Sequence, residues 1–327
     1  MNNPLVSIIV PVYNVENFIE KCAITLFEQD YDNIEYIFVN DCTPDGSISV
    51  LREIIKKYPN RKNSIKIINK EKNEGLPQAR KTGLENSNGE YIMHVDSDDW
   101  VELDMVSSLV KEAIKTDADI VACDFFINYS KKEIYKKENY EKITQESMLK
   151  ALLSDNIMPC VWNKIYKKSL FDCIIFPKFQ TGEDFYLNTQ LFYYAKNISY
   201  LNKAFLHYNR TNSSSISKSF DKENIIDLKD MCIAIETFLK SKHIFEAFKK
   251  YYYIRMCYII LSKSNCNSKD LFLKICNNAN NIEYVWANSQ LSYFKKIIFS
   301  LPFFKLDTIF YACKTIYKKV KIYTIES

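Results

Sequence analysis

The stretch Tyr91-Ile92-Met93-His94-Val95-Asp96-Ser97-Asp98-Asp99-Trp100 decides the fold and the chemistry that this chain can support. Its first half is an apolar run typical of a buried strand, and its second half places three carboxylates within four residues. Like charges this close repel one another, so a bound divalent cation is one explanation for them. The other explanation is an Asp-rich turn that caps a following helix, and this stretch alone favours neither.

The type of ligand indicates the type of cation. Carboxylate oxygens suit Mg²⁺ or Mn²⁺. Mg²⁺ commonly binds one or two protein carboxylates together with phosphate oxygens of a substrate. The acidic turn therefore predicts a site for a nucleoside diphosphate, provided that neighbouring loops supply further contacts.

The composition indicates a globular protein without a nucleic-acid partner. The chain has 327 residues, of which 47% are apolar, enough for one large domain and a smaller one. Its 44 basic and 40 acidic residues give a net charge of +4, and this near balance excludes a dedicated nucleic-acid binder. The sequence does not indicate an oligomeric state.

The cysteines and the start of the chain indicate a compartment. None of the ten cysteines lies in a C-x-x-C pair, which argues against a zinc site. Met1-Asn2-Asn3-Pro4 is no charged-then-apolar leader, and no apolar stretch reaches membrane-spanning length. We therefore expect a cytoplasmic protein whose cysteines are free thiols.

The first hundred residues alternate short apolar runs with helical patterns. This alternation predicts an α/β fold with a mostly parallel sheet covered by helices on both faces. Apolar residues at helical spacing predict a first helix capped by Asn14, a second that opens at Asp45-Gly46-Ser47, and a third that begins at Leu76-Pro77. The four predicted strands, each apolar enough to be buried on both faces, are residues 6–12, 35–40, 65–69 and 91–95.

Polar motifs follow each of these predicted strands. In open α/β sheets the ligand crevice lies at the carboxyl ends of the strands, so the four motifs are expected to meet there. A purely structural sheet needs only turn residues at such positions. The motifs are residues 11–14, 41–47, 73–80 and 96–99.

Two of these motifs end the first and second predicted strands. Pro11-Val12-Tyr13-Asn14 ends the first strand, and Val39-Asn40-Asp41-Cys42-Thr43-Pro44-Asp45-Gly46-Ser47 spans the end of the second. Together with the later motifs, and in the same order, they resemble those of the family 2 inverting glycosyltransferases of the GT-A fold. The resemblance covers roughly residues 5–216.

The resemblance implies a nucleotide-sugar donor, most simply a UDP-sugar. Pro11 and Tyr13 would line the uracil pocket, and Asp41 would bind the base. Cys42 and Pro44 replace a Gly and a Thr of the family pattern V-D-D-G-S-T-D-G-S. These two departures are the sequence support for an alternative, a catalytically silent nucleotide-sugar-binding protein.

The third motif, Asn73-Glu74-Gly75-Leu76-Pro77-Gln78-Ala79-Arg80, is similar to the family's N-x-G-x-x-x-A-R. It is a loop that enters a helix N-terminus, where free N–H groups and the helix dipole favour anions. The resemblance implies that Asn73 and Gly75 approach the donor and that Arg80 lies near its diphosphate. An exposed helical Arg without such a role is the alternative.

The acidic turn matches the family's D-x-D-D, which implies that Asp96 contacts the ribose, Asp98 binds Mg²⁺ or Mn²⁺, and Asp99 assists the metal. An inverting enzyme also needs a base for the attacking hydroxyl. Thr181-Gly182-Glu183-Asp184-Phe185 resembles the family's G-E-D-F, in which the residue at Asp184 is the base and that at Glu183 contacts the acceptor. Alone, these two acids would be an ordinary first turn of a helix.

Two weaker matches follow. Trp162-Asn163-Lys164-Ile165-Tyr166 resembles W-N-K-L-Y and implies an acceptor contact. Tyr208-Asn209-Arg210 with Ser215-Ile216 resembles a Y-x-R…S-I segment, which implies that Arg210 folds over the diphosphate. A late His reaches the metal in some GT-A enzymes, so His207 is a further candidate, whereas His94 is expected to be a satisfied core residue.

The later part of the chain divides in two. The charged residues 131–142 are expected to form an exposed hairpin or a flexible loop. We expect a boundary near Ser219, after a GT-A catalytic domain of residues 1–219 with a nucleotide-sugar half (1–100) and an acceptor half (101–219). Residues 220–327 predict a helical region rich in Tyr, Phe and Lys, suited either to an anionic membrane surface or to packing against the catalytic domain.

These motifs predict a metal-dependent transfer of sugar to a hydroxyl of a cell-surface polysaccharide, lipopolysaccharide or lipid-linked glycan. The Lys and aromatic residues of the helical region suggest the hypothesis of peripheral attachment at the inner face of the plasma membrane. A sugar-phosphate nucleotidyltransferase is a rival with the same architecture. That rival needs a Gly-rich basic loop after the first strand, and Tyr13-Asn14-Val15-Glu16 offers none.

Overall fold

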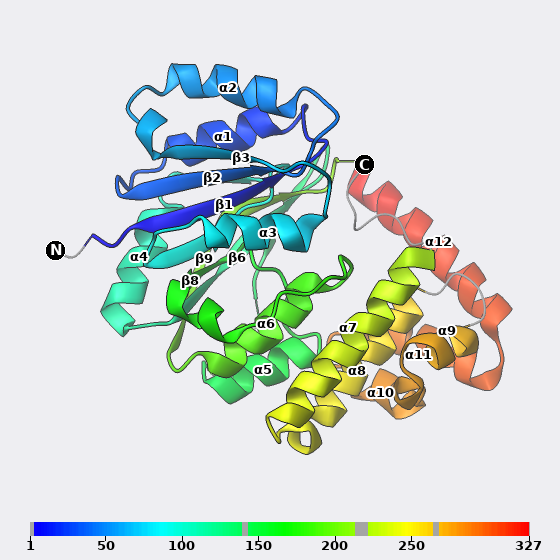
Figure 1. Ribbon diagram of the computed structural model, residues 1–327. Helices are drawn as coiled ribbons and strands as arrows, with labels where there is room; N and C mark the ends of the chain where they lie inside the picture. Colours follow the sequence, from blue (N-terminus) through cyan, green and yellow to red (C-terminus); the bar gives the residue numbers. More distant parts are fainter. Residues whose placement is uncertain (1–2, 139–142, 213–221, 264–267, 327) are drawn as a thin grey trace.

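The computed structural model describes residues 3–138, 143–212, 222–263 and 268–326 of the chain (Figure 1). Its centre is a curled sheet with the strand order β3-β2-β1-β4-β8-β6-β9-β5, and β7 pairs with β6. The strands are β1 (Val6–Val12), β2 (Ile34–Asn40), β3 (Ile65–Asn69), β4 (Tyr91–His94), β5 (Trp100–Val101), β6 (Ile120–Asn128), β7 (Glu133–Lys136), β8 (Lys164–Lys167) and β9 (Ile198–Asn209).

The first four strands confirm the predicted parallel half of the sheet. β1 pairs in parallel with both β2 and β4, and β2 pairs in parallel with β3. β1, β2 and β4 are almost completely buried, as their apolar sequences predicted. The prediction was wrong for β3, which is half-exposed because it is an edge strand with one neighbour.

The second half of the sheet is mixed. β8 pairs antiparallel with β4 and with β6, whereas β6 and β9 are parallel to each other. β6 and β7 form the hairpin expected in the charged segment, and residues 139–142 of that segment lie outside the described part. The later motifs lie in this half of the sheet. Residues 162–166 run into β8, which pairs with β4, and residues 208–210 lie at the end of β9.

Helices cover both faces of the sheet. The helices of the first two thirds of the chain are α1 (Ile19–Phe27), α2 (Ser47–Lys57), α3 (Leu76–Glu85), α4 (Met105–Thr116), α5 (Gln145–Leu153) and α6 (Glu183–Tyr194), with short 3₁₀ turns at Lys62–Ser64 and Lys168–Cys173. Apolar side chains of α1, α2 and α4 form one core with one face of the sheet, whereas α5 and α6 pack on the other face.

Helix starts agree with the sequence in two cases and differ in one. α2 begins at Ser47 and α3 at Leu76-Pro77, as predicted. Asn14 is not the cap of the first helix, which begins at Ile19. Asn14 instead adopts a left-handed backbone (φ 55°) and donates its N–H to Thr43 Oγ1 at 2.8 Å, so the chain turns here before the helix starts.

The last third of the described chain is helical, as predicted. Its helices are α7 (Lys222–Ser241), α8 (Phe245–Lys263), α9 (Ser268–Ile275), α10 (Ile282–Ala287), α11 (Tyr293–Ser300) and α12 (Asp307–Glu326), with 3₁₀ turns at Asn277–Ala279 and Leu301–Phe304. The expected boundary at Ser219 lies outside the described residues. Within the described part, no helix is both long enough and apolar enough to span a membrane.

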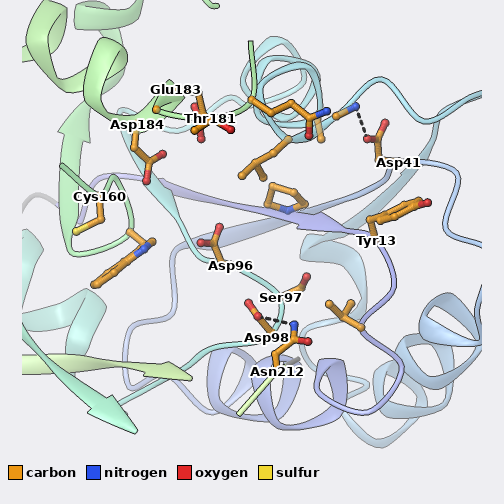
Figure 2. Close-up of a pocket in the computed structure, with 18 of the residues that line it drawn as sticks. Tyr13, Asp41, Asp96, Ser97, Asp98, Cys160, Thr181, Glu183, Asp184 and Asn212 are labelled. Carbon is orange, nitrogen blue, oxygen red and sulfur yellow. Dashed lines mark hydrogen bonds between the residues drawn. The ribbon is translucent and has the colours of Figure 1, made fainter. Parts of the chain in front are cut away.

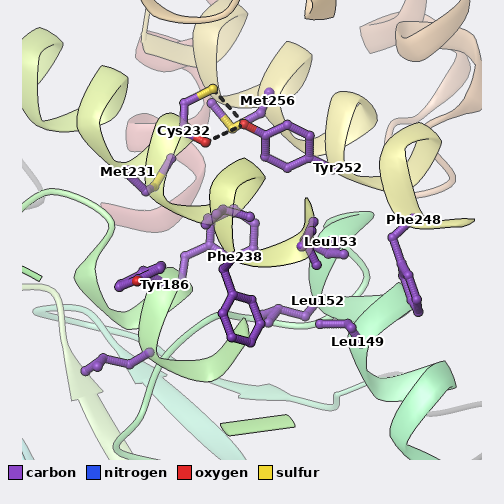
Figure 3. Close-up of a cluster of buried hydrophobic side chains, with 14 of the residues drawn as sticks. Leu149, Leu152, Leu153, Tyr186, Met231, Cys232, Phe238, Phe248, Tyr252 and Met256 are labelled. Atoms are coloured by element: carbon purple, nitrogen blue, oxygen red, sulfur yellow. Dashed lines mark hydrogen bonds between the residues drawn. The ribbon is translucent and has the colours of Figure 1, made fainter. Parts of the chain in front are cut away.

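The helical region shares its core with the sheet-bearing part. Tyr186 of α6 and Leu152 of α5 belong to the same buried cluster as Met231 and Phe238 of α7 and Tyr252 of α8 (Figure 3). Burial of one large apolar side chain contributes about 1.5–3 kcal/mol, so a shared cluster of this kind holds the two parts together. The nine cysteines of the described residues are free.

Candidate active site

A cavity of about 540 Å³ opens at the carboxyl ends of β1 and β4, beside the N-terminus of α6 (Figure 2). In Figure 2, Tyr13 and Asp41 lie at one end, Asp184 and Cys160 at the other, and Asp96 between them. The strand-end motifs therefore meet, as the sheet topology predicted. Of the predicted site residues, those that line the cavity are Pro11, Tyr13, Asp41, Asn73, Gly75, Asp96, Asp98, Glu183 and Asp184.

Asp41 organises the end of the cavity that Tyr13 also lines. Its carboxylate accepts hydrogen bonds from the backbone N–H groups of Gly75 at 2.8 Å and Glu74 at 3.0 Å, and it lies 3.2 Å from Lys70 Nζ. Gly75 has a φ of 87°, and a Cβ there would lie 2.8 Å from Gln180. The positive φ favours glycine at this position of the third motif, and the end of the Gln180 side chain would have to move to admit a larger residue.

The two departures in the second motif leave its turn intact. Cys42 adopts a φ of 57°, the left-handed region that favours the Gly of the family pattern. The turn is stabilised by Asn40 Oδ1, which accepts from Thr43 N at 2.9 Å, and by Asp45 Oδ1, which accepts from Thr43 Oγ1 at 2.7 Å. Tyr13 remains 46% exposed at the cavity rim, open to a flat ligand.

Arg80 lies outside the cavity lining, which differs from the expected place beside a diphosphate. Its side chain is fully buried and joins three carboxylates, because Nη2 lies 2.7 Å from Asp96, Nη1 lies 2.5 Å from Asp184, and Glu183 forms a further ion pair. Burial disfavours the charge of Arg80, but the attraction of Asp184 and Asp96 outweighs burial and raises the pKa of the guanidinium.

The acidic turn brings two of its three carboxylates to the cavity. Asp98 Oδ2 accepts a hydrogen bond from Asn212 Nδ2 at 2.8 Å. Asp99 is buried and points elsewhere: Oδ1 accepts from the Asn209 backbone N–H at 2.8 Å, and Oδ2 has no hydrogen-bond partner among the described residues. Asp99 therefore supports the turn from behind.

The carboxylates of this turn favour a nearby cation. Burial raises the pKa of Asp96 to about 6, a rise that Arg80 opposes and that Asp184 and Asp98 reinforce. Burial also raises the pKa of Asp98, and burial together with repulsion by Asp98 and Asp96 raises that of Asp99 well above its ordinary value. A divalent cation would offset this repulsion.

The donor set fits a cation that shares its ligands with a substrate. Within the described residues, no three His, Cys, Asp or Glu side chains converge as a complete metal site. Mg²⁺ does not need one, since it commonly takes one or two carboxylates and completes its shell with water and phosphate. Asp98 can supply the carboxylate, and Asn212, which also lines the cavity, can supply an amide oxygen.

Asp184 occupies the first turn of α6, at the opposite end of the cavity from Tyr13. It follows Gly182, whose φ of 86° turns the chain into the helix. The side chain of Asp184 is 24% exposed, so it can reach a ligand, whereas Glu183 is buried against Arg80. A carboxylate held by a buried Arg and open to the cavity is in a position to accept a proton.

The two weaker motifs reach the cavity only in part. Trp162 and Tyr208 line the cavity and stack, with ring centroids 5.5 Å apart. Arg210 lies outside the lining, where Nη1 donates to the Tyr208 hydroxyl at 3.0 Å. Ser215-Ile216 lie outside the described residues.

The surroundings of His207 and His94 differ from what the sequence predicted. His207 does not reach the cavity, because its ring stacks between Trp100 and Phe126 and Nε2 lies 2.7 Å from Glu102. His94 is a core residue, but it is not a satisfied one, since neither ring nitrogen has a hydrogen-bond partner in the described part. Neither ring can serve the ligand directly.

Some lining residues had no sequence signal that singled them out. Asn212 lies two residues beyond a noted motif, but its contact with Asp98 depends on the fold. Lys263 comes from the end of α8, in the helical region. Gln180 and Thr181 precede the Glu183-Asp184 pair, and only their place in the cavity shows that they belong to the site.

Residues 7–175 match the sequence model of the family described as glycosyl transferase family 2. The chain belongs to this family. Within it, the chain is similar to glycosyltransferase GlyA of Streptococcus pneumoniae, with 37% identity over 230 residues that cover 65% of this chain and 31% of GlyA. It is also similar to the putative glycosyltransferase EpsH of Bacillus subtilis, with 32% identity over 232 residues that cover 68% of this chain and 65% of EpsH.

The match thus spans about a third of GlyA and just under two thirds of EpsH. Among solved structures, S. aureus TarS 1-349 in complex with UDP-GlcNAc is similar in fold, with a TM-score of 0.66 and 19% identity over 96% of this chain and 92% of that chain. The likeness extends through the helical region as well as the sheet, and it agrees with the predicted GT-A architecture.

Proposed function

We propose that this family 2 glycosyltransferase is an inverting enzyme that moves a sugar from a UDP-sugar to a hydroxyl of a cell-surface or lipid-linked glycan. One observation carries the proposal: Asp184, the acidic turn and the Tyr13–Asp41 pocket line a single cavity. A base, a place for a diphosphate and a place for a nucleobase are then within reach of one bound donor.

The nucleotide is proposed to be UDP for two reasons. The Tyr13 ring is exposed at the rim and can stack on a base, while Asp41, held by Gly75 and Glu74, can accept a hydrogen bond from a uracil N–H. A neighbour in fold, TarS, was solved with UDP-GlcNAc. The sugar itself is not indicated by these contacts.

The proposed reaction begins with the acceptor hydroxyl at Asp184. The carboxylate takes the hydroxyl proton while the oxygen bonds to the anomeric carbon, and the bond from that carbon to the diphosphate oxygen breaks on the opposite side. Mg²⁺ or Mn²⁺ held by Asp98 would neutralise charge on the departing UDP. Arg80 holds the carboxylates of Asp184 and Asp96 at a fixed separation and so orients Asp184 toward the acceptor hydroxyl.

The acceptor is proposed to enter on the side of Trp162 and Tyr208. Stacked aromatic rings offer an apolar face to the C–H groups of a sugar, and Lys263 at the cavity edge can contact an anionic group of the acceptor chain. Both features suit a glycan or a phosphate-linked glycan precursor.

We further propose that the helical region contacts an anionic membrane surface at the inner face of the plasma membrane. Large apolar side chains, most of them aromatic, form an exposed belt on its outer helices: Trp286, Tyr293, Phe294, Ile297, Phe304, Ile316 and Tyr317. The Trp286 and Tyr293 rings lie 5.8 Å apart, and Lys295 Nζ lies 5.2 Å from the Tyr317 ring, so the belt runs from α10 through α11 to α12.

The charge of this belt favours an anionic bilayer over a second protein. Residues 284–317 contain four Lys and one Asp, and exposed aromatic rings beside Lys side chains are typical of the membrane interface. The belt would then bring the cavity to lipid-linked acceptors, because α12 is tied to the end of α8 by Lys314, whose Nζ donates to the Leu261 carbonyl at 3.2 Å.

Asp184→Asn tests the transferase proposal. We expect turnover of the full chain to fall by roughly 10²-fold or more, since one general base contributes about that much, while UDP binding measured by calorimetry is retained. Asp172→Asn, an exposed position in the preceding 3₁₀ turn, is the matched control. A catalytically silent binder would instead show no metal-dependent hydrolysis of any UDP-sugar, and the variant would change nothing.

A further inference from the structure

The loop that leads into the Glu183-Asp184 pair is held from the donor side. Gln78 Nε2, on α3, donates to the Pro177 carbonyl at 3.1 Å. Gln180 packs so closely on Gly75 that a Cβ there would lie 2.8 Å from it. The loop of residues 177–182 therefore contacts the third motif directly.

The same loop is held from the other side by α7 of the helical region. Asp227 Oδ2 accepts hydrogen bonds from two consecutive backbone N–H groups, Thr181 at 2.8 Å and Gln180 at 3.0 Å. Asn224 Nδ2 donates to Thr181 Oγ1 at 3.1 Å. One turn of α7 thus supplies the hydrogen bonds that fix the backbone of this loop.

At Gly182 the loop packs directly against the Met231 side chain of α7. A Cβ on Gly182 would lie 2.2 Å from Met231 Sδ, and the φ of 86° is one that glycine adopts without strain. Gly182 immediately precedes α6, so the position of α7 sets the direction in which the Glu183-Asp184 turn leaves the loop.

A second contact from the helical region reaches the other side of the same turn. Arg255 of α8 is buried, its guanidinium lies 5.1 Å from the Phe185 ring, and Nη1 lies 2.5 Å from Asp155. Phe185 follows Asp184 in the first turn of α6. Asp184 is therefore flanked by residues that α7 and α8 hold in place.

We propose that Asp227 is a positioning residue for the transfer reaction, which fixes the Gln180–Gly182 backbone and thereby the direction of the Asp184 carboxylate. This inference rests on the proposed function, in which Asp184 is the base. A carboxylate that accepts from two consecutive N–H groups makes charge-assisted hydrogen bonds, which are stronger and more directional than neutral ones. Without it, both N–H groups need new partners and the loop gains freedom.

Asp227→Ala should lower kcat about tenfold or more while the KM for the UDP-sugar stays within about twofold, because misplacement of a reacting group by about 1 Å can cost up to 10²-fold. The side-chain hydrogen bonds of Asp227 go to Gln180 and Thr181, whereas the Asp41 carboxylate is held by the N–H groups of Glu74 and Gly75. Asp227→Asn should keep most of the activity, since its amide oxygen still accepts both N–H groups. A purely structural role would not produce this split between kcat and KM.

Asp230→Ala, an exposed Asp of the same helix, is the matched control and should keep wild-type kinetics. Equal kcat in the Asp227→Ala and Asp230→Ala variants, or a parallel loss of UDP binding and turnover in Asp227→Ala, would overturn the inference. Asp184→Asn, measured alongside, separates the two proposals. If it is inactive while Asp227→Ala is normal, only the positioning role fails; if it is fully active, the proposed base is wrong.

Discussion

Arg80 and Asp184 are 104 residues apart in the sequence, yet Nη1 of Arg80 lies 2.5 Å from Oδ1 of Asp184. The same guanidinium lies 2.7 Å from Asp96, in the turn that precedes Asp98. One buried cation thus joins the carboxylate proposed as the base to the carboxylate expected at the ribose. The Arg80 guanidinium therefore fixes the donor side of the cavity relative to the acceptor side.

Arg80→Met should destabilise the fold by about 3 kcal/mol or more, because it leaves buried carboxylates without their cation. Arg80→Lys keeps the charge but cannot form the same fork, so an intermediate loss is expected. Urea unfolding followed by fluorescence measures both values. The exposed Arg52→Met on α2 is the control, and an Arg80→Met protein as stable as that control would contradict a structural role for the guanidinium.

The parallel half of the fold was predictable because each strand is a short apolar run with a turn signal after it. Strand bounds at residues 6–12 and 65–69 agree with β1 and β3. The order of strands in the sheet was not predictable: β3 lies at an edge with one neighbouring strand and is half-exposed for that reason. The first helix starts late because Thr43, 29 residues away from Asn14, accepts the Asn14 N–H.

The place of a site residue was predictable where it depends on the residue's own loop, as for Asp41 and Asp98, which line the cavity. It was not predictable where the place depends on a distant element. Arg80 looked like a phosphate ligand at a helix start, but burial beside Asp96 and Asp184 gives it another place. Lys263 and Asp227 come from helices in which the sequence shows no motif, so no pattern could connect them with Asp184.

Asp98→Asn should weaken the stabilisation that Mn²⁺ gives in the presence of UDP. A ligand that binds only the folded state raises the melting temperature of the protein, and the rise is larger for a tighter ligand. Loss of the carboxylate lowers the affinity for the cation. Differential scanning fluorimetry with UDP, with and without Mn²⁺, measures the effect. Asp32→Asn, whose side chain is 97% exposed, should keep the full shift. An unchanged Mn²⁺ shift in Asp98→Asn would remove Asp98 from the proposed metal site.

His94 should make the protein sensitive to acid. Burial, reinforced by Arg80, lowers the pKa of His94 to about 3, whereas an unfolded His has a pKa near 6.5. The unfolded state therefore binds more protons below pH 6.5, and stability is lost as the pH falls from about 6.5 toward 3. At pH 5, about 1.5 pH units below the pKa of an unfolded His, this group lowers the unfolding free energy by about 2 kcal/mol, since each unit contributes about 1.4 kcal/mol.

His94→Leu should remove most of this loss between pH 7 and pH 5, measured as the difference in unfolding free energy by urea titration at each pH. The substitution is feasible because neither ring nitrogen has a hydrogen-bond partner in the described chain. His243→Asn is the control, since His243 is exposed and Asn tolerates its φ of 57°. If His94→Leu shows the same pH dependence as wild type, the acid sensitivity has another source.

The belt on α10, α11 and α12 should bind anionic vesicles through its Lys side chains. Lys295 is half-buried beside the Tyr317 ring, Lys305 is exposed next to Phe304 in the sequence, and each Lys near an anionic surface contributes about 1 kcal/mol. Lys295→Glu with Lys305→Glu should therefore lower the partition coefficient onto phosphatidylserine-containing vesicles by about 30-fold or more in a flotation assay. Binding should also fall as salt rises, because the attraction is screened. Lys56→Glu with Lys249→Glu, two exposed lysines elsewhere, should bind as wild type does, and equal flotation of both double variants would refute the membrane surface.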